Sequence, residues 1–155
     1  MSTPSLSVHD ATAMRQLGSA VGRAARAGDV LLLDGVFGAG KTTFVQGLAQ
    51  GLDVRDGVSS PSFVLEHQHL GRLPLYHMDL YRLERLDPAL LEELEEHLFG
   101  DGVAAVEWPA LLPASLRDNA ATLHFTIEGD GIRRVALDTA QEHLRQAFLP
   151  VRPAC

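Results

Sequence analysis

Residues 35–42 read Gly-Val-Phe-Gly-Ala-Gly-Lys-Thr and match the pattern G-x-x-x-x-G-K-T, the P-loop or Walker A signature. In such a loop the glycines let backbone N–H groups curl around phosphates, the lysine reaches the terminal phosphates, and the threonine hydroxyl ligates Mg²⁺. Of the 13 lysine and arginine residues in the chain, Lys41 is the only lysine. A compact, flexible ammonium is therefore kept at the one position where a phosphate-binding loop requires it.

The segments on either side of this loop predict a strand and a helix. Residues 30–33 form the apolar run Val-Leu-Leu-Leu, which is typical of a strand buried on both faces. Apolar residues recur at helical spacing from Phe44 to Ala49, and Gly51 marks the expected end of the helix. A phosphate in the loop would face the helix N-terminus, where free N–H groups and the helix dipole favour negative charge. The alternative is a glycine-rich turn with an incidental lysine, but motif and context together favour a nucleotide-phosphate site.

Length and composition indicate a single globular domain. The chain has 155 residues and one cysteine, Cys155, at its end. We expect one domain over residues 1–149 that contains the P-loop and is large enough to bury a core without disulfides, and a flexible tail over residues 150–155. No apolar run approaches the length of a membrane span, and no signal-peptide pattern opens the chain. We therefore expect a cytoplasmic protein that makes no use of a membrane.

The net charge excludes one class of function. At −7, it argues against a free-standing nucleic-acid binder, since such proteins normally display a basic face. The arginines are scattered, and Arg133-Arg134 is their only adjacent pair. Any role near RNA is therefore expected to run through a partner.

Hydrophobic periodicity predicts the remaining elements. We expect a first helix over residues 7–27, with Ser7 or Asp10 as its N-cap, and a loop over residues 52–62. The expected strands cover residues 63–69, 73–78, 103–106, 121–128 and 132–138, and two further helices begin at Pro88 and cover roughly residues 139–148. The last two strands flank Gly129-Asp130-Gly131, a hairpin signal. This order predicts an α/β fold, a P-loop NTPase-like three-layer sandwich in which helices flank a central mixed β-sheet.

Two strands of the expected sheet end in acidic residues, Asp79 and Glu107. Open α/β sheets bind ligands outside the carboxyl ends of their strands, so both side chains could face the nucleotide. Phosphoryl transfer needs a carboxylate that holds Mg²⁺ or its water shell, and a group that orients the attacking water. Either residue alone would pass for an ordinary surface carboxylate. Beside a P-loop, both become candidates for these two roles.

Three other features admit a structural and a functional interpretation. The segment Ser59-Ser60-Pro61-Ser62 offers hydroxyls that could order around a γ-phosphate, although a Ser/Pro turn is the simpler interpretation of the local sequence. Trp108, the only tryptophan, either packs in the core or contacts nucleotide or a partner. The seven histidines form no metal-binding motif. We interpret His67 and His69 as surface residues and His77 as a structural residue.

Four segments, taken in order, resemble a single family. Residues 35–45 contain the P-loop, residues 58–63 read V-S-S-P-S-F, residues 77–83 read H-M-D-L-Y-R-L, and residues 107–109 read E-W-P. This series is similar to that of the bacterial TsaE (YjeE) ATPases and extends over nearly the whole chain. The last two motifs are the more specific ones, because ordinary P-loop proteins lack them.

The resemblance implies a role in making N6-threonylcarbamoyladenosine (t6A) at adenosine 37 of tRNAs that read codons beginning with A. Members of that family are small ATPases that dock on TsaB and TsaD, two related ASKHA-fold proteins of which TsaD is the transferase. The implied cofactors are ATP and Mg²⁺, with slow intrinsic hydrolysis that partners stimulate. Hydrolysis would support repeated rounds of modification rather than the group transfer itself. Contact with tRNA would be indirect, through the TsaB–TsaD complex.

The resemblance also assigns roles by position. The implied nucleotide-binding residues are Gly38, Ala39, Gly40, Lys41, Thr42, Thr43, Ser62 and Trp108. The implied catalytic residues are Lys41, Asp79 and Glu107, and the implied metal ligands are Thr42, Asp79 and Glu107. Many members have Asp-Leu where this chain has Val36-Phe37, and threonine where it has Ser62. Ser62 keeps a hydroxyl, whereas Val36 cannot replace a carboxylate and receives no polar role.

Three competing functions share the P-loop. A small-molecule or nucleotide kinase would need an acceptor pocket and an arginine-bearing lid, for which Arg82 and Arg85 are the candidates. A small GTPase is a weak alternative, because its guanine-binding N-K-x-D motif has no counterpart: the only lysine is already committed and the only asparagine is Asn119. A nucleotide-dependent assembly factor with negligible turnover differs from the leading hypothesis only in whether hydrolysis is needed.

Overall fold

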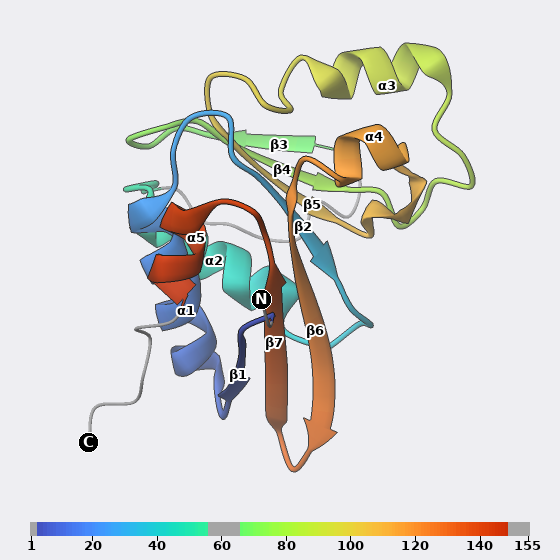
Figure 1. Ribbon diagram of the computed structural model, residues 1–155. Helices are drawn as coiled ribbons and strands as arrows, with labels where there is room; N and C mark the ends of the chain where they lie inside the picture. Colours follow the sequence, from blue (N-terminus) through green and yellow to red (C-terminus); the bar gives the residue numbers. More distant parts are fainter. Residues whose placement is uncertain (1–2, 56–65, 149–155) are drawn as a thin grey trace.

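The computed structural model describes residues 3–55 and 66–148 (Figure 1). Its strands are β1 (Ser5–Val8), β2 (Val30–Asp34), β3 (Glu66–His69), β4 (Leu75–Asp79), β5 (Val103–Glu107), β6 (Ala121–Gly129) and β7 (Ile132–Asp138). Its helices are α1 (Ala11–Ala24), α2 (Lys41–Gly51), α3 (Pro88–Glu95), α4 (Ala114–Arg117) and α5 (Glu142–Phe148), with a 3-10 turn at Pro109–Leu111. None of the helices in these residues is long and apolar enough to cross a membrane.

All seven strands join one sheet in the order β1-β7-β6-β2-β5-β4-β3. Strands β6, β2, β5 and β4 run parallel to one another in the centre, whereas β1, β7 and β3 pair antiparallel to their neighbours. The mixed sheet expected from the sequence is therefore confirmed. Because β2 is central and its parallel neighbours share its direction, the carboxyl ends of β2, β5 and β4 meet at one edge of the sheet.

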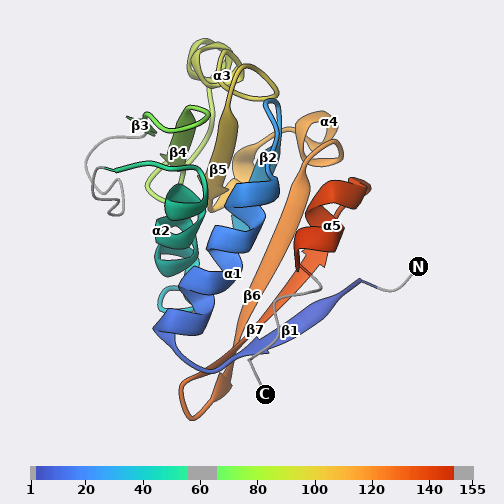
Figure 2. The same ribbon diagram turned by 90° about the vertical axis from the view of Figure 1, so that its left-hand side faces the viewer.

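Helices cover both faces of the sheet and complete the three layers. Helices α1, α2 and α5 lie on one face, which Figure 2 turns toward the viewer, and alternate residues of β2 such as Leu31 and Leu33 pack into that core. Helix α3 and the 3-10 turn cover the other face, where Leu32 packs with Leu94 and Leu112. Every apolar residue of β2 is buried, which explains its uninterrupted apolar sequence.

Helix α2, which begins at the P-loop lysine, is held by unusually close packing against α1. A Cβ on Gly47 would lie 2.1 Å from the carbonyl oxygen of Arg15, and one on Gly18 would lie 2.2 Å from that of Phe44. The sequence alone makes Gly47 look like a weak point in a helix. The structure shows that only a glycine allows the two backbones to approach this closely.

The start of the first helix differs from the sequence-based expectation. The predicted helix over residues 7–27 begins at Ala11, and Asp10 is the N-cap because its carboxylate accepts a hydrogen bond from Ala13 N–H at 2.7 Å. Ser7 belongs instead to β1, where it pairs with Arg134 of β7. Strand pairing over a distance of more than 120 residues overrides the local helical pattern, and local sequence does not report it.

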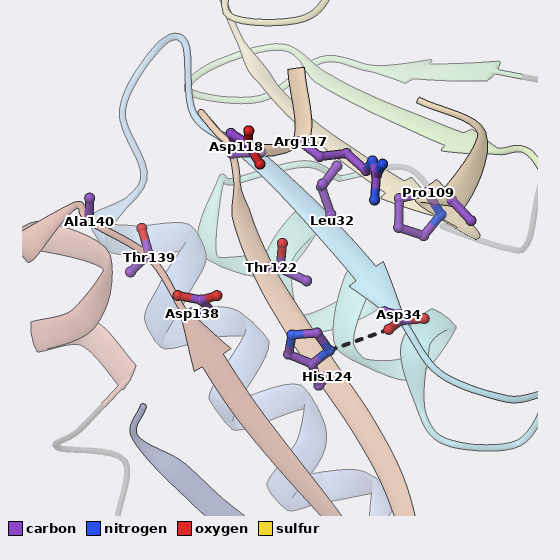
Figure 3. Close-up of a pocket in the computed structure, with 12 residues that line it drawn as sticks. Leu32, Asp34, Pro109, Arg117, Asp118, Thr122, His124, Asp138, Thr139 and Ala140 are labelled. Carbon is purple, nitrogen blue, oxygen red and sulfur yellow. Dashed lines mark hydrogen bonds and ion pairs between the residues drawn. The ribbon is translucent and has the colours of Figure 1, made fainter. Parts of the chain in front are cut away.

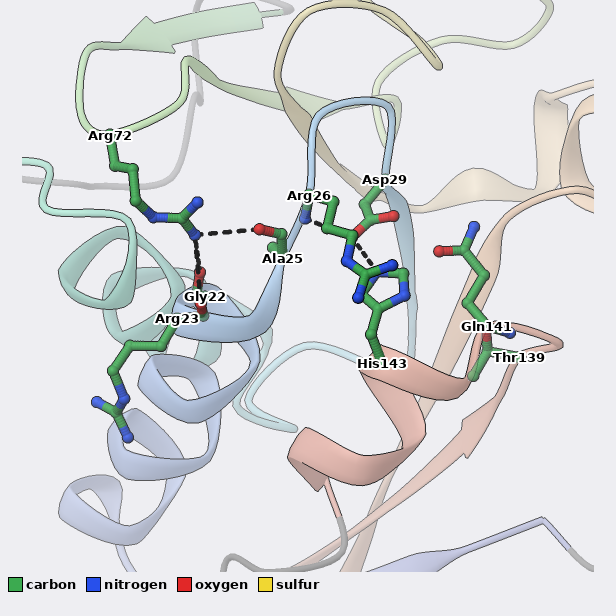
Figure 4. Close-up of polar contacts among 9 residues, drawn as sticks. All are labelled: Gly22, Arg23, Ala25, Arg26, Asp29, Arg72, Thr139, Gln141 and His143. Carbon is green, nitrogen blue, oxygen red and sulfur yellow. Dashed lines mark hydrogen bonds and ion pairs between the residues drawn. The ribbon is translucent and has the colours of Figure 1, made fainter.

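The carboxyl end of α1 is closed by side chains from elsewhere in the chain (Figure 4). One guanidinium nitrogen of Arg72 donates to the carbonyl oxygens of Gly22 at 2.8 Å and Ala25 at 3.1 Å. Asp29 accepts from Arg26 N–H at 2.8 Å and lies 2.8 Å from Nε2 of His143 on α5. These contacts hold the turn that leads into β2. They therefore help to set the position of β2 and of the P-loop that follows it.

The remaining predicted elements are confirmed with small shifts at their ends. The hairpin of β6 and β7 forms around residues 129–131, and α3 begins at Pro88 behind an Asp87 N-cap. Helix α5 begins at Glu142 rather than at Thr139, whose hydroxyl accepts from Gln141 N–H at 3.0 Å and so turns the chain first. The strand predicted over residues 63–69 is described only as Glu66–His69. Residues 56–65, with most of the serine-rich loop, and residues 149–155, with the expected tail, lie outside the described part.

Candidate functional site

The P-loop links the end of β2 to the start of α2, as the sequence predicts. Two of its glycines have left-handed backbone conformations, with φ of 79° at Gly38 and 104° at Gly40. A Cβ on Gly40 would also lie 2.7 Å from the Cε of Met14 on α1. Both positions therefore need glycine for their backbone conformation, whereas the terminal methyl of Met14 beside Gly40 could shift.

Two contacts hold the tip of the loop. Ala39 N–H donates to the carbonyl oxygen of Val36 at 3.2 Å, which closes a turn within the loop. The Nε of Arg133, at the start of β7, donates to the carbonyl oxygen of Gly38 at 2.9 Å. In the sequence, Arg133 is notable only as half of the Arg133-Arg134 pair. Its approach to the P-loop depends on β6 lying beside β2, which no local pattern reports.

Lys41 is buried, with 5% of its surface exposed, and its ammonium is held by groups of the site itself. The Nζ donates to the carbonyl oxygen of Gly35 at 2.6 Å and lies 3.6 Å from the centroid of the Trp108 ring. Burial lowers the pKa of Lys41, while the nearby carboxylates of Glu107, Asp79 and Asp34 act in the opposite direction. The only lysine of the chain thus lies desolvated between an aromatic face and acidic side chains.

Asp79 and Glu107, the two strand-end carboxylates, are direct neighbours in the sheet. They are paired in the register of β4 and β5, and Glu107 is in turn paired with Leu33 of β2. Glu107 is buried, with 4% of its surface exposed, whereas Asp79 is half-buried and accepts from Tyr81 N–H at 3.0 Å. The carboxyl ends of three parallel strands therefore bring both acids next to the P-loop, as the sequence predicts.

His77 is the residue of this site whose environment the sequence did not indicate. Its side chain is fully buried, at 0% exposure, and its Nε2 lies 2.5 Å from Oε2 of Glu107. The sequence-based interpretation of His77 as structural left out this contact with a candidate catalytic residue. The sequence signal for a role at the site was that His77 lies two residues before the strand-end acid Asp79. Its actual partner, Glu107, lies 30 residues away on another strand.

Three aromatic rings gather at the mouth of the site. Phe37 lies with its centroid 4.6 Å from that of Tyr81 and 5.0 Å from that of Trp108, and Tyr81 and Trp108 lie 4.9 Å apart. Phe37 and Tyr81 remain 62% and 50% exposed. Trp108 has a left-handed backbone, with φ of 57°, which is a strained conformation for a residue with a side chain. Of the two interpretations of Trp108, the geometry places it at the site.

These residues enclose a cavity of about 310 Å³. It is lined by Phe37, Gly38, Gly40, Lys41, Thr42, Thr43, Asp79, Glu107 and Trp108. Of the residues expected to bind nucleotide, Ala39 is buried beneath the loop and does not line the cavity, and Ser62 lies outside the described residues. The structure therefore brings all the other predicted site residues to one place.

A second cavity, of about 470 Å³ and so larger than the P-loop cavity, lies on the face of the sheet that is turned away from α1 and α2 (Figure 3). It is bordered by Leu32, Thr122 and Asp138, and His124 Nδ1 lies 3.3 Å from Oδ2 of Asp34 at its rim. It shares no lining residue with the P-loop cavity. Both members of the His124–Asp34 pair are largely exposed, so this pair is weak, and we assign no chemistry to this cavity.

The side chains around the P-loop fit a Mg²⁺–nucleotide complex. The Thr42 hydroxyl and the carboxylates of Asp79 and Glu107 are the hard oxygen donors that Mg²⁺ prefers. Over residues 3–55 and 66–148, no group of three or more His, Cys, Asp or Glu side chains could hold a metal ion on its own. In P-loop sites few protein ligands suffice, because phosphates and waters complete the coordination.

Comparisons with known proteins relate the chain to one family. The family model for "Threonylcarbamoyl adenosine biosynthesis protein TsaE" matches residues 8–135. The tRNA threonylcarbamoyladenosine biosynthesis protein TsaE of Treponema pallidum is 38% identical over 120 residues, covering 77% of this chain and 89% of that protein. The protein of the same name from Bacillus subtilis is 42% identical over 112 residues, covering 72% and 70%. The crystal structure of Bacillus subtilis YdiB superposes with a TM-score of 0.78 at 28% identity, covering 97% of this chain and 96% of that one.

Proposed function

The chain belongs to the TsaE family of threonylcarbamoyl adenosine biosynthesis proteins, and from this premise we propose that it is a P-loop ATPase that serves t6A modification of tRNA. The observation that carries the proposal is the cavity in which Lys41, Thr42, Asp79 and Glu107 meet. ATP hydrolysis by P-loop proteins uses a lysine, a threonine hydroxyl and strand-end carboxylates beside a glycine-rich loop.

The residues of the loop have distinct roles in this proposal. Backbone N–H groups of residues 38–43 at the start of α2 bind the phosphates, helped by the helix dipole. Lys41 gives up its contact with the Gly35 carbonyl and binds phosphate oxygens instead, since a charge-assisted hydrogen bond to an anion is the stronger one. Thr42 and Asp79 hold Mg²⁺, which, when bound, neutralises charge on the phosphate oxygens.

Glu107 orients the water that attacks the γ-phosphate. It lies at the buried end of the site, beside Asp79 and away from the exposed rim. Phosphoryl transfer offers little covalent work to the protein, so positioning and electrostatics lower the barrier. We propose slow intrinsic turnover that protein partners stimulate.

TsaB and TsaD, as the TsaB–TsaD heterodimer, are the proposed partners. Val36, Phe37 and Tyr81 expose 59%, 62% and 50% of their surface beside the cavity, and clustered exposed apolar side chains of this kind favour a protein contact. The net charge of −7 supports contact with tRNA only through that complex. The cytoplasmic location and the single domain over residues 1–149 remain predictions.

ATP turnover by the purified protein, alone and with the TsaB–TsaD pair of the same source, tests the proposal. We expect the pair to stimulate turnover, and the stimulation to vanish in Lys41→Ala. Turnover that responds only to a small-molecule acceptor would contradict the ATPase assignment and favour a kinase. Binding of the partners with no turnover at all would identify an assembly factor instead.

A further inference from the structure

His77 is a polar side chain buried inside the sheet. It lies in the middle of β4, fully buried, and is paired with Ala105 of β5. It faces the same core as Leu75 and Ala105, opposite to Met78. An imidazole at such a position costs free energy unless it is hydrogen-bonded, and an apolar residue would pack there without that cost.

The buried imidazole is hydrogen-bonded to the carboxylate of Glu107. Its Nε2 lies 2.5 Å from Oε2 of Glu107, which lies two residues beyond Ala105 on the neighbouring strand. Its other nitrogen, Nδ1, is buried and has no hydrogen-bond partner among the described residues. Among residues 3–55 and 66–148, the bond to Glu107 is therefore the only polar contact that offsets the burial of His77.

This asymmetry assigns the tautomer of His77. A proton on Nδ1 would leave a buried donor without an acceptor, which costs more than an unpaired lone pair. A proton on Nε2 instead donates directly to the Glu107 carboxylate and leaves only an acceptor unpaired. The neutral Nε2–H form is thus the one that the surroundings satisfy best.

We propose that His77 is a positioning residue that holds the Glu107 carboxylate in one orientation, with Oε2 bonded and Oε1 left to accept a hydrogen bond from the attacking water. This inference rests on the proposed ATPase function. The alternative partner for Glu107 is the Lys41 ammonium, which lies in the same cavity. Within residues 3–55 and 66–148 these two side chains form no ion pair, and the bond to His77 keeps Glu107 directed elsewhere. Without His77, the Glu107 carboxylate would be free to turn toward Lys41 before ATP binds and would no longer be held in position for the water.

Three variants separate positioning from packing. His77→Gln keeps an amide N–H close to the place of Nε2, and His77→Leu removes the donor but fills the space. Met78→Leu is the matched control, because it alters the adjacent fully buried position on the other face of β4. We expect His77→Leu to lower kcat by about 10- to 100-fold, as loss of a supporting hydrogen bond does. KM for ATP should change little, because Lys41 and the loop remain intact. His77→Gln should recover most of kcat, and Met78→Leu should resemble the wild type.

A double variant tests the coupling directly. In a Glu107→Gln background, His77→Leu should cause no further loss of kcat, because the group that it positions is already disabled. A further loss of the same size as in the wild-type background would overturn the inference. So would a His77→Leu variant with the kcat of Met78→Leu.

Nitrogen-15 NMR of the imidazole gives a readout that needs no ATP. We expect His77 to show the Nε2–H tautomer in the free protein, with a downfield proton that moves upfield or disappears in Glu107→Ala. An Nδ1–H tautomer in a protein that hydrolyses ATP would overturn this inference alone. Absence of turnover by the wild type with its partners, together with the Nε2–H signal, would overturn the proposed function and leave the His77–Glu107 bond standing.

Discussion

The ammonium nitrogen of Lys41 lies 3.6 Å from the centroid of the Trp108 ring. The same nitrogen donates to the carbonyl oxygen of Gly35 at 2.6 Å, so a ring from the end of β5 and a carbonyl from the end of β2 hold it together. Trp108 takes a left-handed backbone conformation to present its ring there. A strained residue over the P-loop lysine is typical of a functional site, because packing alone would not select that conformation.

Lys41→Ala should weaken ATP binding by about 100-fold or more, since a charge-assisted hydrogen bond contributes on the order of 3 kcal/mol. Isothermal titration calorimetry measures the loss. Lys41→Arg should not restore binding, because a planar guanidinium does not fit a position where the lysine is only 5% exposed. Normal affinity in Lys41→Ala would show that the phosphates bind elsewhere.

Glu107→Gln should leave ATP affinity nearly unchanged and lower turnover by about 100-fold or more, as the loss of a group that orients or activates water does. The amide keeps the size of the side chain but removes the negative charge. Single-turnover kinetics and binding titrations on the same sample separate the two effects. Equal losses of affinity and turnover would place Glu107 in nucleotide binding instead.

Arg133→Gln should loosen the P-loop and weaken ATP binding by up to about 10-fold, which corresponds to one hydrogen bond. Its neighbour is the matched control: Arg134 contacts Glu128 and the Ser5 hydroxyl on the opposite face of β7, away from the loop. Hydrogen exchange of the P-loop amides, measured without nucleotide, should rise in Arg133→Gln and not in Arg134→Gln. The same exchange rates in both variants would show that the bond to Gly38 does not hold the loop.

Gly47→Ala should destabilise the protein by about 2 kcal/mol, because the added methyl group meets the backbone of α1 and overpacks the contact. In an unpacked helix the same change would be stabilising by up to about 1 kcal/mol, so the sign of the effect reports the contact. Urea denaturation measures it, with the exposed Gln50→Ala on the same helix as control. An increase in stability would contradict the close approach of α1 and α2.

Tyr76 should make stability fall at high pH. Burial and the hydrogen bond to Asp101, at 2.8 Å, raise the pKa of Tyr76 to about 12. Because the unfolded value is about 10, folding favours the protonated phenol: its contribution is complete below about pH 10 and is lost as the pH rises toward about 12. The free energy of unfolding of the wild type should therefore converge with that of Tyr76→Phe over this range. The contribution of Lys41 is the same in both proteins and cancels when the two free energies of unfolding are subtracted. Parallel curves of the free energy of unfolding against pH would refute the prediction.

The local sequence was sufficient to predict the loop before α2, the buried strand β2 and the β6–β7 hairpin. The glycines of residues 35–40 specify the turn between β2 and α2, the apolar run before them specifies a buried strand, and the glycines at 129 and 131 specify a hairpin. Asp79 and Glu107 were recognisable because strand-end acids beside a P-loop have few other uses. Each of these signals lies within a few residues of the structure it predicts.

The contacts that complete the site join segments far apart in the chain, so only the tertiary structure decided them. His77 meets Glu107 across 30 residues, and Arg133 reaches Gly38 across 95. Ser5–Val8 forms an edge strand because it pairs with β7, although the helix predicted over residues 7–27 included its last two residues. A side chain carries its own polarity and backbone preference, but its partner depends on which strands lie side by side. That order is determined by packing of the whole sheet between its two helical layers.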